Sequence, residues 1–323
     1  MPGLITHYLG GQSALRAIDH KIRIYIAPCA RLFNLGTQGP DIFFYYPTGF
    51  ITKRIRGIGS TMHESDLGQF FMHMADAIKE TASPSKRKFL FAYTAGALAH
   101  YAMDVRTHSY VYGMTHLPQE SGLKESGLKE SSRHRHFETS IDILMLRRLR
   151  DKQPADFKLA ELITPEEIQR RTAAAAVSDA IRDIYNANIH PWDVYQAMGR
   201  MASNTNILQS KSGKRKTLLG ALERLTMGSK IISALIHTQK VSDGVDYLNL
   251  DKTSWSAPWS PDMQRNESFV ELFESAVSDT ATMIDALHSY TQSRITRDEL
   301  AGIIDNRSLK TGYGENEPAA KPI

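Results

Sequence analysis

The sequence predicts an all-α protein, and three observations support this fold class. Apolar residues recur at helical spacing from end to end of the 323 residues, residues typical of helix starts precede these stretches, and alternating strand-like runs with hairpin turns are scarce. A hydrophobic content of 41% is enough for a sizeable core. Because no linker separates regions of different composition, we expect one multi-helix domain at residues 1–306, followed by a disordered tail at 307–323.

The clearest helix is expected at residues 83–110. Ser83 suits the N-cap and Pro84 the first helical position, and an uncharged run from Phe89 to Met103 follows. This run of 15 residues is shorter than the roughly 20 apolar residues of a membrane span, so it indicates a buried helix. We expect further helices at residues 12–35, 64–81, 133–151, 164–187, 192–203, 215–240 and 266–291.

Two segments between these helices lack a helical period. Residues 121–130 are a tandem duplication of Ser-Gly-Leu-Lys-Glu, too short for a repeat architecture, and we expect a polar connection there. Residues 241–265 contain Trp255 and Trp259 together with two prolines, which predicts an ordered irregular loop anchored by aromatic side chains.

Charge and cysteine content exclude several classes of protein. A net charge of +4 is too mild for a dedicated nucleic-acid-binding surface. The single cysteine, Cys29, excludes an intrachain disulfide and a cysteine-based zinc finger. The first residues do not resemble a signal peptide, so we expect a cytoplasmic location with no transmembrane segment. The sequence does not determine the oligomeric state.

The residues with the most informative spacing lie in the helix expected at 83–110. His100, Asp104 and His108 follow one another in steps of four, which places them on one helix face. The pattern H-x-x-x-D-x-x-x-H is expected by chance only about 0.03 times in a chain of this composition. Neighbouring members lie about 5–6 Å apart at Cβ, but the two histidines are about 12 Å apart along the helix. One ion is therefore not expected to bind all three. The spacing suggests either that Asp104 bridges two ions, or that His100 and Asp104 share one ion while His108 serves a neighbour.

A second pair of potential ligands begins the helix expected at 133–151. His134 and Glu138 share one helix face, whereas His136 points away from it. Opposed helix faces with imidazole and carboxylate ligands are typical of metal sites in helical bundles, and these ligands suit zinc, manganese or iron. A hydrogen-bonded His100–Asp104 pair in the core, without metal, is the structural alternative.

Several segments, in order, resemble the bacterial zinc-dependent phospholipase C family, which is related to the S1/P1-type nucleases. His7 resembles the histidine that family members carry near the N-terminus, residues 35–43 resemble the family's G-x-x-G-P-D segment, and His63 resembles the next histidine. His100, Asp104, His108, His134 and Glu138 follow. The segment 249–275, with its two tryptophans, resembles the family's C-terminal part. The resemblance covers about residues 5–275 and implies an all-helical fold with two or three zinc ions.

The resemblance also implies ligands for each ion. One zinc would be held by Asp41, His63, His100 and Asp104. A second would be held by His108, His134 and Glu138, and a third by His7 with Asp104 bridging. Secreted members complete the third site with an N-terminal tryptophan, and this chain has none before Trp192. No acidic residue precedes Asp19, so choline specificity is not expected to carry over.

The activity implied is hydrolysis of phosphodiesters by metal-activated water, phospholipase C-like, with Asp41 as ligand or general base. Phe43 and Tyr45 are expected to line a pocket, and Glu64 and Arg106 to position water and contact phosphate; core or surface roles are the alternatives for all four. The substrate would be a phosphoester such as a phospholipid. The duplication at 121–130 is expected at the rim of the site, where it would gate access.

Three questions stay open at this stage. The same site could hydrolyse nucleotides or single-stranded nucleic acid, as in the S1/P1-type nucleases, or the metal could only cross-link helices in a non-catalytic protein. Peripheral membrane contact is the third question, because a short basic cluster could touch anionic lipid. That cluster consists of Lys211, Lys214, Arg215 and Lys216.

Overall fold

The computed structural model describes residues 3–46, 53–116, 130–208 and 241–314, and in these ranges the protein is all-α, as the sequence predicts. The only β-type pairings among the described residues are the isolated bridges Trp255–Arg265 and Arg307–Gly314. No helix in these ranges combines the length and the apolar character that a bilayer span requires. The expected helix at 215–240, most of the duplication at 121–130 and the basic cluster at 211–216 lie outside the described residues.

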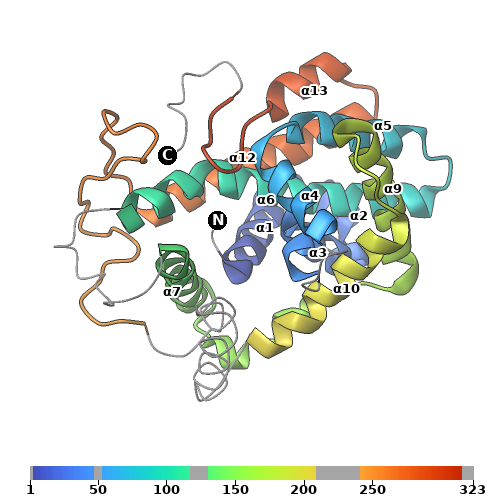
Figure 1. Cartoon of the computed structure of the whole chain (residues 1–323). Helices are drawn as coiled ribbons and strands as arrows, with labels where there is room; N and C mark the ends of the chain where they lie inside the picture. Colours follow the sequence, from blue (N-terminus) through green and yellow to red (C-terminus); the bar gives the residue numbers. More distant parts are fainter. Residues whose placement is uncertain (1–2, 47–52, 117–129, 209–240, 315–323) are drawn as a thin grey trace.

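Up to residue 116, the described residues fold into short helices around one long helix. The α-helices are α1 (Leu4–Ala17), α2 (His20–Ile26), α3 (Ala30–Gly36), α4 (Lys53–Glu64), α5 (Leu67–Glu80) and α6 (Pro84–His116), with the 3-10 turns η1 (Ala27–Cys29) and η2 (Gly39–Tyr45) between them. At 33 residues, α6 is about 50 Å long and runs through the centre of the molecule (Figure 1). It packs against α1, α3, α5, α9 and α12.

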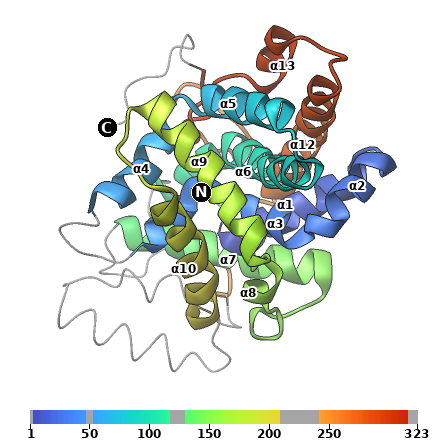
Figure 2. The ribbon, with the colours of Figure 1, turned by 90° about the vertical axis from the view of Figure 1, so that its right-hand side faces the viewer.

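The described residues from 130 onward complete the bundle. Its elements are α7 (Glu130–Arg150), η3 (Pro154–Asp156), α8 (Leu159–Leu162), α9 (Glu167–Tyr185), α10 (Pro191–Leu208), α12 (Phe269–Thr291) and α13 (Arg297–Ile304). The helices α9 and α10 pack against each other on one side of the molecule (Figure 2). Both α12 and α13 begin with complete capping boxes, Ser268 with Glu271 and Thr296 with Glu299.

The segment 241–265 is irregular and ordered, as expected. Trp255 and Trp259 are buried, and the Trp255 indole Nε1 donates to the carbonyl of Glu267 at 3.0 Å. The indole also packs edge-on against Tyr110 of α6, with ring centroids 5.3 Å apart. The two tryptophans therefore anchor this loop to the core.

Three expectations about the elements need correction. The helix expected at 12–35 is three helices: Ile18 is extended, Asp19 caps α2, and Pro28 lies in the 3-10 turn that precedes α3. The helices α4 and α13 were not expected. We expected residues 307–314 to be disordered, but they pack against the bundle. The evidence is Leu309, whose side chain is fully buried there.

Two glycines bring α3 unusually close to α6. A Cβ on Gly96 would lie 2.1 Å from the carbonyl oxygen of Phe33, and one on Gly36 would lie 2.3 Å from that of Tyr93. At both positions the hydrogen atom of a glycine fits between the two backbones, whereas a Cβ would not. The close crossing places the end of α3, and η2 after it, beside the middle of α6.

Candidate metal centre

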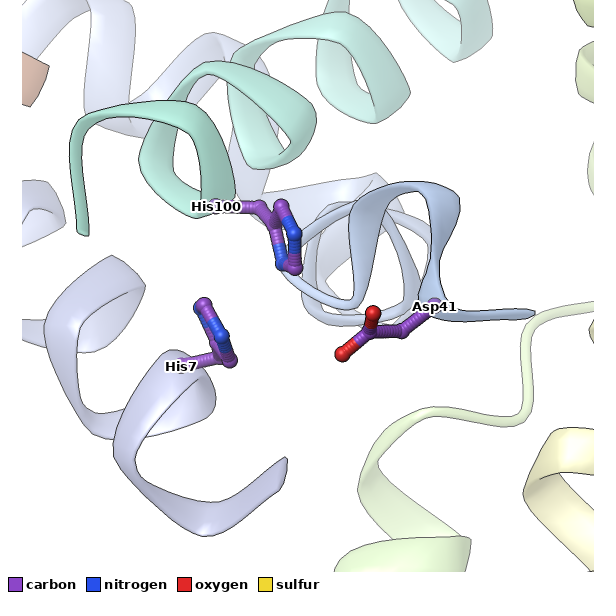
Figure 3. A group of neighbouring side chains, drawn as sticks. All are labelled: His7, Asp41 and His100. Atoms are coloured by element: carbon purple, nitrogen blue, oxygen red, sulfur yellow. The ribbon is translucent and has the colours of Figure 1, made fainter. Parts of the chain in front are cut away.

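A buried group of imidazoles and carboxylates lies where α1, η2, α4 and α6 meet. The side chains of His7, Asp41 and His100 come from three of these elements and point toward one another (Figure 3). His63 at the end of α4 and Asp104 of α6 complete the group. We call these five residues the first cluster. All are buried, and His7, His100 and Asp104 are 0% exposed.

Asp104 is at the centre of the first cluster. Its Oδ1 lies 3.3 Å from the Nε2 of His7. Its Oδ2 lies 3.2 Å from the Nε2 of His100 and 3.9 Å from that of His63. The two carboxylate oxygens thus face different imidazoles. The Nε2 of His63 also lies 3.2 Å from Oδ1 of Asp41.

The glycine-rich segment before Asp41 explains how the sequence builds this site. Gly39 has a φ of +48°, which disfavours any side chain, and a Cβ there would lie 2.4 Å from the ring of His100. The chain therefore turns tightly over the imidazole and returns Asp41 to the same side. The carbonyl of Thr37, in the same segment, accepts a hydrogen bond of 3.2 Å from Nδ1 of His100.

His108, His134 and Glu138 form a second cluster. Nε2 of His134 lies 2.8 Å from Oε1 of Glu138, one turn further along α7, and the rings of His108 and His134 are 5.8 Å apart. One ligand atom from each of the three residues can be chosen so that all lie within 4.8 Å of one another; the same is true of two overlapping trios in the first cluster. The three ligand atoms of each trio are therefore close enough to one another to bind the same ion.

Three of the histidines are oriented in the same way. Nδ1 of His63 faces the carbonyl of Gly59 at 2.6 Å, Nδ1 of His100 faces that of Thr37, and Nδ1 of His108 faces that of Leu309 at 2.7 Å. A carbonyl only accepts hydrogen bonds, so each Nδ1 carries a proton, which leaves Nε2 as the ring atom available to a metal. This is the arrangement by which proteins orient metal-binding histidines.

The buried polar atoms of the first cluster fit a bound cation. Both ring nitrogens of His7, Nε2 of His100 and both oxygens of Asp104 are buried without a hydrogen-bond partner among the described residues. Burial of polar atoms without hydrogen bonds in an apolar interior is costly unless a cation binds them. Imidazole nitrogen and carboxylate oxygen are zinc ligands.

The protonation states agree with this interpretation. Burial, reinforced by the neighbouring His100, lowers the pKa of His7, and burial lowers that of His108 well below its usual value, so both rings are neutral. Burial alone would raise the pKa of Asp104, but His100 and His7 hold it well below its ordinary range. Burial also opposes ionisation of Glu138, yet nearby positive charge and the hydrogen bond with His134 lower its pKa to about 2.

His63 is the exception, because the pKa of this histidine is raised. Burial would lower it, but the hydrogen bond and charge of Asp41 outweigh that effect. A protonated His63 paired with Asp41 is a metal-free arrangement of these two side chains. The sequence left a metal-free pair open for His100 and Asp104 instead, and their Nε2 and Oδ2 lie 3.2 Å apart. The first of these pairings leaves Nε2 of His100 and both ring nitrogens of His7 without a hydrogen-bond partner among the described residues.

The four residues expected to contact substrate or position water have other surroundings in the structure. Arg106 lies about 200° around α6 from Asp104 and pairs with Asp279 of α12, with Nε and Oδ2 2.5 Å apart. Glu64 is exposed and faces Lys310. Phe43 is 1% exposed and belongs to the hydrophobic core. Tyr45, at the end of η2, is half-buried and also packs against the core.

Sequence reasoning missed three neighbours of the clusters. Tyr112 continues the four-residue step of α6, and its ring lies 4.8 Å from that of His108 and 4.6 Å from that of His134. Asp142 continues the same step on α7 after Glu138 and binds the start of α1. Continuing each pattern by one turn would have found both residues. The carbonyl of Leu309 gives no sequence signal, because any residue could supply it.

The helical fold and the two clusters of histidine and carboxylate side chains are together typical of helical metal-dependent hydrolases. A family model supports a more specific assignment: the model described as zinc dependent phospholipase C matches residues 6–192, which include all eight expected ligands. This match covers more than half of the chain, and the protein belongs to that family. Comparisons with curated proteins and with solved structures found no match.

Proposed function

We propose that the protein is a zinc-dependent phosphodiesterase of phospholipase C type, with zinc held by the first and second clusters. The observation that carries the proposal is the set of buried, unpartnered ligand atoms around Asp104. Membership of a zinc-dependent phospholipase C family supports both the metal and the class of reaction.

Asp41, His63, His100 and Asp104 would hold one ion, and His108, His134 and Glu138 a second. The two oxygens of Asp104 face His7 on one side and His100 on the other, which supports a bridging role and a third ion at His7. Carbonyl hydrogen bonds fix three of the imidazoles before metal binds, so little side-chain freedom is lost on binding.

Bound zinc would supply a lowered pKa for a coordinated water and stabilisation of charge at phosphate oxygens. The protein's own contribution begins with Asp41, a residue that is 5% exposed and lies beside His63. This carboxylate can orient water or accept a proton at its oxygens. The buried surroundings exclude bulk water and strengthen electrostatic interactions at the reacting phosphate.

Metal analysis combined with an activity assay tests the proposal. Protein purified without chelator or nickel should contain two or three zinc ions and hydrolyse a phosphatidylcholine or phosphatidylethanolamine phosphodiester. His100→Ala should lose at least one ion and reduce kcat/KM by at least about 100-fold, because buried ligands of a catalytic metal have no substitute. His190→Ala, an exposed histidine that precedes α10, is the matched control.

Single-stranded DNA, assayed in parallel, separates the substrate classes. Preference for DNA would replace phospholipid by nucleic acid as the substrate. Stoichiometric zinc without hydrolysis of any phosphodiester would show that the metal only joins helices. Zinc content that is unchanged in His100→Ala would overturn the assignment of the first cluster.

A further inference from the structure

A cavity lies beside α6, on a face that is turned about 100–200° around the helix from Asp104. Its volume is about 270 Å³, and none of the eight expected ligands lines it. Three segments distant in sequence form its walls: one face of α6, the irregular loop anchored by Trp255, and the C-terminal segment at 307–314. The last two segments lie outside the range matched by the family model.

Three arginines converge on this cavity, one from each wall. They are Arg106 of α6, Arg265 of the loop and Arg307 of the C-terminal segment. Hydroxyl groups from each wall join them, and none of the described residues that line the cavity is acidic. The polar lining residues other than the arginines are Ser109, Ser260, Thr311 and Tyr313.

Each arginine is held in place by a carboxylate that does not line the cavity. The Nε of Arg106 binds Asp279, and the Nε of Arg307 binds Asp305 at 2.9 Å. Arg265 binds Glu267 and also lies over the Trp255 ring, 4.6 Å from its centroid. These pairs neutralise part of the charge at longer range, but the charged and hydroxyl groups that line the cavity are three guanidinium groups and four hydroxyls, beside an apolar part.

We propose that this cavity binds a phosphate group, as a second site separate from the metal centre. Guanidinium groups match the geometry of phosphate oxygens, and hydroxyl donors supply further hydrogen bonds. The apolar part of the lining, Val105, Ala257 and Met263, can contact the organic part of a phosphomonoester or a lipid headgroup. A free phosphate compound and an anionic lipid share this chemistry.

Titration calorimetry with inorganic phosphate tests the site on the zinc-loaded protein. Arg106→Gln and Arg307→Gln should each weaken one binding step by about tenfold or more, because each removes a charge-assisted contact. Arg106 is 44% exposed on its side chain, so its replacement is not expected to disturb the fold. Arg297→Gln is the matched control, since Arg297 forms a similar pair with Asp76 on α5, away from the cavity.

Phosphate can also bind at the metal centre, and the variants separate the two sites. Binding at the metal centre would be the same in the wild type and in both cavity variants. If no step is weakened in either variant, the proposal is wrong. This outcome is independent of the zinc content and hydrolysis that test the proposed function.

Vesicles identify the source of the phosphate group. Sedimentation with phosphatidylcholine vesicles containing phosphatidylglycerol should decrease in Arg106→Gln and Arg307→Gln, but not in Arg297→Gln, if a headgroup occupies the cavity. Binding of inorganic phosphate that depends on these arginines, with vesicle binding that does not, would assign a soluble phosphate compound. Binding of inorganic phosphate that does not depend on these arginines overturns the site, whatever the vesicles show.

Discussion

At the scale of single residues, Asp104 links the two ends of the first cluster. Its carboxylate is fully buried and faces His7 with one oxygen and His100 with the other. A buried carboxylate that no hydrogen bond satisfies is costly unless positive charge compensates it. The residue is therefore the one on which most of the proposed metal binding depends.

Asp104→Asn should remove at least one zinc ion per chain, because an amide has one oxygen and no charge and cannot bridge two ions. Elemental analysis after gel filtration measures the loss, and circular dichroism checks the helical content. Asp183→Asn is the control, since Asp183 also faces a histidine, His73, but is exposed. Full zinc content in Asp104→Asn would contradict the bridging role.

Gly39 gives a second prediction at this scale. Gly39→Ala should destabilise the protein by at least about 1 kcal/mol, because φ is positive there and the new Cβ would collide with the ring of His100. The zinc content of Gly39→Ala should fall together with its stability. Gly302→Ala in α13, where a Cβ meets nothing within 4 Å, should instead raise stability by about 0.5–1 kcal/mol. Urea unfolding compares the two; equal effects would argue against the collision.

At the scale of elements, the position of His7 depends on how α1 is attached to α7. Asp142 accepts hydrogen bonds from the backbone amides of Ile5 and Thr6 at 3.1 and 2.8 Å and from the Thr6 hydroxyl at 2.6 Å. It thereby satisfies amides at the start of α1 and adds a favourable charge at the helix N-terminus. The helix that carries His134 and Glu138 thus also positions the helix that carries His7.

Asp142→Asn should lower the free energy of unfolding by about 2–3 kcal/mol, because the amide group places a donor opposite backbone donors in a buried site. Chemical denaturation measures the change. Asp151→Asn, at an exposed position after α7 with a φ of +50° that asparagine tolerates, should change stability by less than about 0.5 kcal/mol. A similar value for both variants would show that the attachment contributes nothing.

At the scale of the whole molecule, one hydrophobic core extends from Leu4 to Leu309 and includes side chains from α1 to α13. We propose that these residues form one folding domain that includes the metal clusters. The eight expected ligands lie on five helices or turns, so bound metal would join elements that are distant in sequence.

Removal of metal should therefore lower the melting temperature of the whole protein in one transition. Each ion bound only by the folded state contributes about 4 kcal/mol when free zinc exceeds its Kd by 1,000-fold. Differential scanning calorimetry with and without a chelator measures the shift, and adding zinc should reverse it. A melting temperature that does not respond to the chelator would exclude metal from the core.

Much of the site could be predicted from sequence because it depends on local spacing. Steps of four residues placed His100, Asp104 and His108 on one face and His134 with Glu138 on another, and periodicity predicted the long helices with modest errors at their ends. Short elements were harder, because α4 has polar residues over most of its length and α13 has only eight residues. The cytoplasmic location remains a prediction.

The sequence by itself determined the all-helical class, the pairs of ligands within single helices and, through its resemblance to a family, the eight residues expected to bind zinc. Only the tertiary structure showed that His7, Asp41 and His63 meet His100 and Asp104, and that Asp142 and the Leu309 carbonyl position their partners. The reason is physical: spacing along a helix fixes which side chains share a face, whereas contacts between distant segments depend on how closely whole helices pack. At Gly36 and Gly96, that closeness was decided by the absence of side chains.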